Sequence, residues 1–95
     1  MILNKEQRAI ALAQLIEEIK VKHNITIEIP TVSGIMPRAC NDSEKFCSLR
    51  YDSDRGFEIS TSGSWVTPNE AVQYATKLLN LSAVAVKLNQ LYKPL

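Results

Sequence analysis

The sequence lacks most of the features that announce a chemical activity. Its 95 residues include one histidine, two cysteines and three glycines. The glycines form no phosphate-binding or nucleophile motif, and the cysteines and histidine are too few for a full tetrahedral zinc site. We therefore expect no metal, no cofactor and no catalytic residue, which means that the chain is not expected to be an enzyme.

An excess of charge is also missing. Eleven Lys and Arg face ten Asp and Glu, which gives a formal net charge of +1. Nucleic-acid-binding domains usually carry a marked basic excess, so nucleic acid is not the expected partner. No apolar run approaches the roughly 18 residues of a membrane span, and the charged N-terminal segment is unlike a signal peptide. We expect a cytoplasmic protein that does not contact a membrane, with Cys40 and Cys47 reduced and metal-free.

What the sequence does contain is ordinary globular patterning. Hydrophobic residues make up 45% of the chain and charged residues 22%, which predicts a single domain over residues 1–95. Asn4 and Gln7 form a variant capping box, and the apolar residues after them recur with a helical period. This pattern predicts an amphipathic helix over about 5–22.

Three later segments alternate apolar and polar residues with the period of two that is typical of strands. They are residues 25–29, 45–51 and 56–61. The turn residues DSDR separate the last two, which predicts a hairpin with Cys47 and Leu49 facing inward. The segment TVSGIMPRACNDSE, rich in turn formers, is expected to be a connecting loop.

The segment TPNEA predicts the start of a second helix, with Thr67 as its cap, Pro68 in the first turn and Glu70 closing a capping box. The element order is then α-β-β-β-α. We expect an α+β fold in which a three-stranded antiparallel sheet packs against the helices. This order is shared with double-stranded-RNA-binding domains, but Glu70 lies where that family has a basic cluster, so the chain is not assigned to it.

The second helix is expected to be longer than the body that it covers. Unbroken from 68 to 92 it would span about 38 Å, against roughly 32 Å for a globule of this chain length. Its first half carries an apolar stripe that can cover the sheet, and its second half presents another side. The apolar residues of the second half are Leu81, Val84, Leu88, Leu91 and Tyr92.

Two arrangements bury these five residues. The helix can break near residues 80–82 and fold its end back against the first helix, or it can continue and pair with a second copy about a two-fold axis. Because residues 80–90 contain no glycine or proline, the homodimer is preferred. The five residues are then expected to form the dimer interface.

The outward face of the predicted hairpin is the candidate binding surface. Phe46 and Arg50 lie together there, and an aromatic residue beside an arginine is typical of an interface hot spot. Arg38, Lys45 and Arg55 add positive charge around them.

We expect a small non-enzymatic protein-binding module that acts by occupying a partner's surface, as inhibitors and immunity proteins of phages and mobile elements do. Two alternatives remain open. One is a nucleic-acid-binding domain that uses the basic hairpin surface. The other is a small thiol-dependent enzyme that uses Cys40 or Cys47 with His23.

Overall fold

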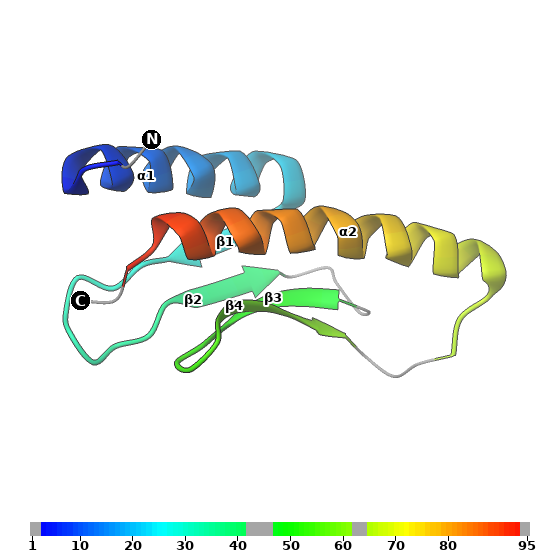
Figure 1. The fold of residues 1–95 in the computed structure, drawn as a ribbon. Coiled ribbons are helices and arrows are strands. Elements are labelled where there is room, and N and C mark those ends of the chain that lie inside the picture. Colours follow the sequence, from blue (N-terminus) through cyan, green and yellow to red (C-terminus); the bar gives the residue numbers. More distant parts are fainter. Residues whose placement is uncertain (1–2, 42–46, 62–64, 94–95) are drawn as a thin grey trace.

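The computed structural model describes residues 3–41, 47–61 and 65–93. Two helices and four strands form within these residues, and both helices lie on one face of the strands (Figure 1). The elements in chain order are α1 (Lys5–His23), β1 (Ile25–Glu28), β2 (Arg38–Asn41), β3 (Cys47–Asp52), β4 (Gly56–Thr61) and α2 (Pro68–Leu91). The fold is therefore α+β, as the sequence predicts.

The prediction of a three-stranded sheet is wrong. β1 pairs with β2 and β3 pairs with β4, both antiparallel, and the described residues of β2 lie beside β3 without joining the two sheets. The unexpected strand is β2, whose sequence RACN has little intrinsic preference for a strand and was expected to be loop. Its conformation depends on pairing with β1. The observed order α-β-β-β-β-α also differs from the α-β-β-β-α order of double-stranded-RNA-binding domains.

Both predicted helix starts are confirmed. The Asn4 side chain accepts a hydrogen bond from the Gln7 backbone N–H at 2.8 Å, and the Gln7 side chain accepts one from the Asn4 N–H at 3.1 Å. Thr67 and Glu70 make the same reciprocal pair at the start of α2. The helix α1 ends at His23 and is followed by the cap residue Asn24, which adopts a left-handed conformation that asparagine tolerates.

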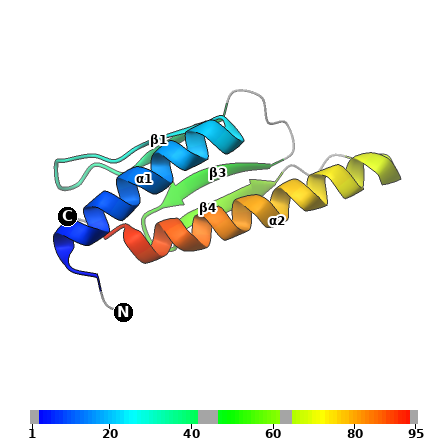
Figure 2. The same ribbon diagram turned by 90° about the horizontal axis from the view of Figure 1, so that it is seen from above.

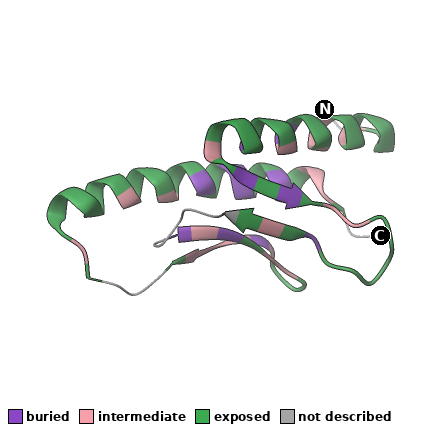
Figure 3. Cartoon of the chain, turned by 180° about the vertical axis from the view of Figure 1, so that it is seen from behind, coloured by how far each residue is buried: buried purple, intermediate pink, exposed green. Residues whose placement is uncertain are grey.

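A single apolar cluster fills the space between the helices and the strands. Leu15 and Ile19 of α1 are buried in it, as are Cys47, Leu49 and Phe57 of the β3–β4 hairpin. These are the faces that the sequence periodicity predicts for the first helix and for the hairpin. Buried positions accordingly gather in the middle of the molecule, where the helices meet the strands (Figure 3).

The helix α2 is unbroken over 24 residues, or about 36 Å, in a molecule 45 Å along its longest axis. Its C-terminal half lies over β3 and β4, and its N-terminal part, residues 68–79, extends past the strands (Figure 2). We call residues 68–79 the overhang. The expectation that this first half covers the sheet is wrong, because Val72 and Leu79 are 67% and 74% exposed.

A side-chain amide fixes the C-terminal half of α2 to the edge of β4. Asn89 accepts a hydrogen bond from the Phe57 backbone N–H at 2.7 Å and donates one to the Phe57 carbonyl at 3.0 Å. The amide thus takes the place that a further strand would occupy on β4. Gly56 permits this approach, since a Cβ there would lie 2.6 Å from the Asn89 side-chain oxygen.

Candidate functional site

The two arginines predicted for the hairpin surface are paired with acids. The Nε of Arg50 donates to Glu58 at 2.6 Å across the β3–β4 ladder, and the Nε of Arg55 lies 3.4 Å from the same carboxylate. Arg55 also lies near Asp52, whose pKa is lowered by hydrogen bonds from the backbone N–H groups of Asp54 and Arg55. The hairpin surface is therefore close to electrically neutral.

Of the other predicted binding residues, Arg38 is the one that lies within the described residues. Arg38 begins β2, where its register partner on β1 is Glu28. Lys45 and Phe46 lie outside the described residues. The predicted hot spot of Phe46 and Arg50 thus stays a prediction, and the positive charge expected around it is offset by Glu58 and Asp52 on the described part of the hairpin.

The proposed dimer interface was inferred from side chains that a monomer would leave in water. That premise is wrong, because Leu81, Val84 and Leu88 are buried within one chain, with Leu88 at 0% exposure. Leu91 and Tyr92 are half-buried and pack against the same core. The three buried side chains are not available to a second copy, whereas Leu91 and Tyr92 keep part of their surface exposed. The homodimer stays a prediction, without the three buried residues in its interface.

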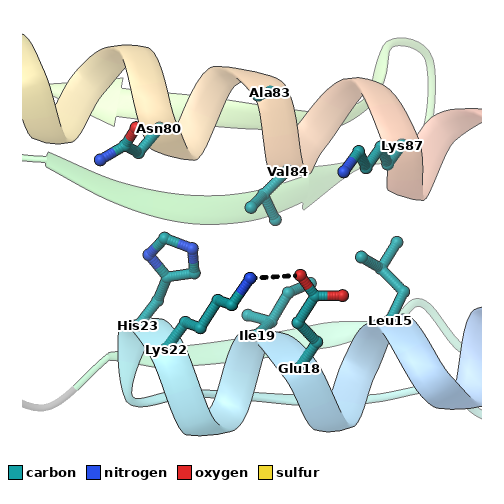
Figure 4. A pocket seen from close by; sticks show the side chains of 9 residues that line it. All are labelled: Leu15, Glu18, Ile19, Lys22, His23, Asn80, Ala83, Val84 and Lys87. Atoms are coloured by element: carbon teal, nitrogen blue, oxygen red, sulfur yellow. Dashed lines mark hydrogen bonds and ion pairs between the residues drawn. The ribbon is translucent and has the colours of Figure 1, made fainter.

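The thiol hypothesis requires a cysteine and a histidine in contact. Cys47 is buried in the core, and Cys40 is exposed on β2. His23 lies instead in the groove between α1 and α2, lined by residues such as Asn80 and Lys87 and by neither cysteine (Figure 4). Within the described part of the chain, no group of three His, Cys, Asp or Glu residues is placed to hold a metal.

The helix–helix groove is a charged surface above the core. Glu18 and Lys22 of α1 form an ion pair at 2.8 Å, and Lys87 of α2 faces them across the groove (Figure 4). The hydrogen bond and charge of Lys22 lower the pKa of the Glu18 carboxylate, with a smaller contribution from Lys87. The groove therefore contains an acid beside its lysines, as the hairpin contains acids beside its arginines.

A different surface forms where α1 begins, α2 ends and the β1–β2 loop lies, at one end of the molecule (Figure 1). The loop carries three exposed apolar side chains, Val32, Ile35 and Met36. They line a hollow of about 350 Å³ together with Tyr51 and Tyr92. We call these five residues the loop-end surface.

Three packed aromatic rings form part of the loop-end surface and its base. The rings of Tyr51 and Tyr92 meet edge-to-face with centroids 5.6 Å apart, and both contact Phe57 in the same manner. Burial and the neighbouring Tyr51 raise the pKa of the Tyr92 phenol, so it remains a neutral hydrogen-bond donor at physiological pH. Gly34 supplies a positive φ within the loop.

A larger cleft adjoins the loop-end surface, with Tyr92 in both. It has a volume of about 530 Å³ and lies between the first turns of α1, the end of β1 and the end of α2. Its floor is apolar, formed by residues that include Leu12, Ile29 and Leu91, and three cations surround it: Lys5, Arg8 and Lys93. We call it the basic-rimmed cleft.

Sequence reasoning missed both of these surfaces. The available signal was the segment IPTVSGIMP, whose glycine and prolines indicate a loop but which also carries several large apolar residues. No described helix has the length and hydropathy of a membrane span. No protein-family model, curated protein or solved structure matches the chain.

Proposed function

We propose that this chain is a non-enzymatic protein-binding module that acts by occupying a partner's surface. One observation carries the proposal: Val32, Ile35 and Met36 are 59%, 57% and 54% exposed side by side in one loop. Single exposed apolar residues are common on soluble proteins, but a cluster beside a hollow is typical of an interaction surface. We expect the module to act in the cytosol, as inhibitors and immunity proteins of mobile elements do.

The chemistry of the loop-end surface favours a protein as the partner. Methionine adapts to irregular apolar surfaces, and tyrosine contributes a large contact area with a hydrogen-bonding tip. Pro30 and Pro37 flank the loop and restrict its backbone, which lowers the entropy lost on binding. Nucleic acid is less well supported, because Arg50 and Arg55 of the candidate basic surface are engaged with Glu58 and Asp52.

The proposal is tested by introducing a charge into the loop. Ile35→Asp should abolish capture of the partner from cells that contain the protein, while leaving the circular dichroism spectrum unchanged. Val21→Asp is the matched control, because Val21 is also exposed, at 76%, but lies near the C-terminal end of α1, whereas the loop lies near the start of α1. Proteins that are retained by the wild type and Val21→Asp and lost with Ile35→Asp, as measured by mass spectrometry, would support the proposal. Equal retention by all three proteins would refute it.

A further inference from the structure

The basic-rimmed cleft differs from the other charged surfaces because the described residues that line it include cations and no carboxylate. Within the described chain, Lys5, Arg8 and Lys93 take part in no ion pair, and no carboxylate is among the residues that line the cleft. Glu6 lies between Lys5 and Arg8 in sequence but does not line it. The hairpin and the helix–helix groove, by contrast, each contain their own acids.

The floor of the cleft offers apolar contacts in addition to the charges of the rim. Leu12, Ile29 and Leu91 are half-buried, so each keeps part of its apolar surface in contact with solvent. An apolar side chain that fills this space would remove that surface from water, a gain of roughly 25 cal/mol per Å² before the costs of binding. The cations would then lie around an occupant whose flanks are negatively charged.

Resting on the proposed protein-binding function, we propose that the basic-rimmed cleft binds a partner segment with an apolar side chain flanked by Asp or Glu. A chain segment fits better than a free carboxylic acid. Small ligands are held in sites that enclose most of their surface, whereas this floor is open on its outer side. A segment can also continue past Tyr92 onto Val32 and Met36, because Tyr92 lines both hollows.

The electrostatic part of the proposal predicts a marked salt dependence. Lys5 and Lys93 are exposed, so their attraction to carboxylates is screened as ionic strength rises. Unpaired rim cations also accelerate association with an acidic partner more than they slow its dissociation. Both effects should be absent from a purely apolar contact.

The test uses two fluorescein-labelled peptides with a central Phe-Leu pair, one flanked by Glu and the other by Lys, in anisotropy titrations. The Glu-flanked peptide should bind more tightly, and raising NaCl from about 20 to about 200 mM should weaken it severalfold. Lys5→Glu and Lys93→Glu should each weaken it by about fivefold, the effect of a charge contact worth about 1 kcal/mol. Lys20→Glu is the control, since it makes the same charge change on α1 outside the cleft.

Lys5→Glu should not disturb folding, because an acid in the first turn of a helix is favoured by the helix dipole. Equal binding of the two peptides, or equal loss with Lys5→Glu and Lys20→Glu, would overturn the cleft proposal. So would the failure of both peptides to bind. None of these results refutes the protein-binding function as long as Ile35→Asp abolishes capture of the partner. If Ile35→Asp instead retains the partner as well as the wild type does, the protein-binding function is refuted.

Discussion

The two halves of α2 share one continuous helix and have opposite environments. In the C-terminal half, Leu81, Val84 and Leu88 are at most 9% exposed, whereas Val72 and Leu79 in the overhang are 67% and 74% exposed. Both halves carry apolar residues at helical spacing, and both are helical throughout. An amphipathic stripe therefore shows which side of a helix is apolar, and not whether anything covers that side.

The difference arises from contacts that are distant in sequence. Asn89 binds both backbone groups of Phe57, and Tyr92 packs on Tyr51 and Phe57, so four long-range contacts hold the C-terminal end over the hairpin. The overhang has only Leu78 packed against the core among its large aliphatic residues. The position of α2 is set by its last turns, and the remaining length extends past the strands.

The largest expected effect comes from a substitution in the buried C-terminal half of α2. Leu88→Ala removes a side chain that is 0% exposed and leaves a cavity at the centre of the core. We expect it to lower the free energy of unfolding by about 2 to 5 kcal/mol, as measured by urea denaturation. Leu79→Ala is the matched control in the same helix. Equal losses for the two variants would contradict the assignment of the buried and exposed halves.

The next effect concerns the amide that fixes α2 to β4. Asn89→Ala removes both hydrogen bonds to Phe57 and leaves the backbone groups of that residue without these partners. We expect a loss of about 1 to 3 kcal/mol in unfolding free energy. Gln90→Ala, at the adjacent exposed position, should change stability by less than about 0.5 kcal/mol. A small effect of Asn89→Ala would show that aromatic packing alone positions the helix.

Gly56→Ala tests the same contact from the strand side. The residue has a φ of 82°, and an added Cβ would lie 2.6 Å from the Asn89 side-chain oxygen. We expect a cost of about 1 to 2 kcal/mol from the backbone conformation alone, with a further cost from the clash. In a double-mutant cycle with Asn89→Ala, only the clash should disappear. Additive losses would mean that Asn89 moves aside freely.

The local elements could be predicted from sequence because their causes are local. The capping residues Asn4 and Thr67 specify both helix starts, and alternation in the hairpin specifies which side chains of β3 and β4 are buried. The strand β2 could not be predicted in this way, because RACN becomes a strand only through its pairing with β1. Which half of α2 is buried likewise depends on where the hairpin lies under the helix.

In the candidate site, too, features with local causes could be predicted from sequence and features assembled by the tertiary fold could not. The neutralisation of Arg50 was foreseeable, since a hairpin that turns at DSDR places it opposite Glu58. The basic-rimmed cleft was not, because it is assembled from residues 5–12, 29–30 and 91–93, which only the tertiary fold brings together. Periodicity within one segment contains no information about such an assembly.

A smaller effect is expected at the start of the overhang. Thr67→Ala removes the side-chain oxygen that accepts the Glu70 N–H at 3.2 Å, which is worth about 1 kcal/mol of helix stability. Because few core contacts oppose fraying there, amide exchange should accelerate by about fivefold over the first turns of α2 and stay constant near residues 84–88. Uniform acceleration along the helix would indicate that both halves unfold as one unit.

The smallest effect is expected on the exposed face of the overhang. Leu79→Glu replaces a side chain that is 74% exposed, and substitutions at such positions usually change the unfolding free energy by less than about 0.5 kcal/mol. The urea midpoint should therefore match that of the wild type. Sedimentation velocity on the same two proteins adds a second readout. If the wild type is a dimer that Leu79→Glu dissociates without unfolding, the overhang is the interface, and the second copy covers the half of α2 that the sheet does not reach.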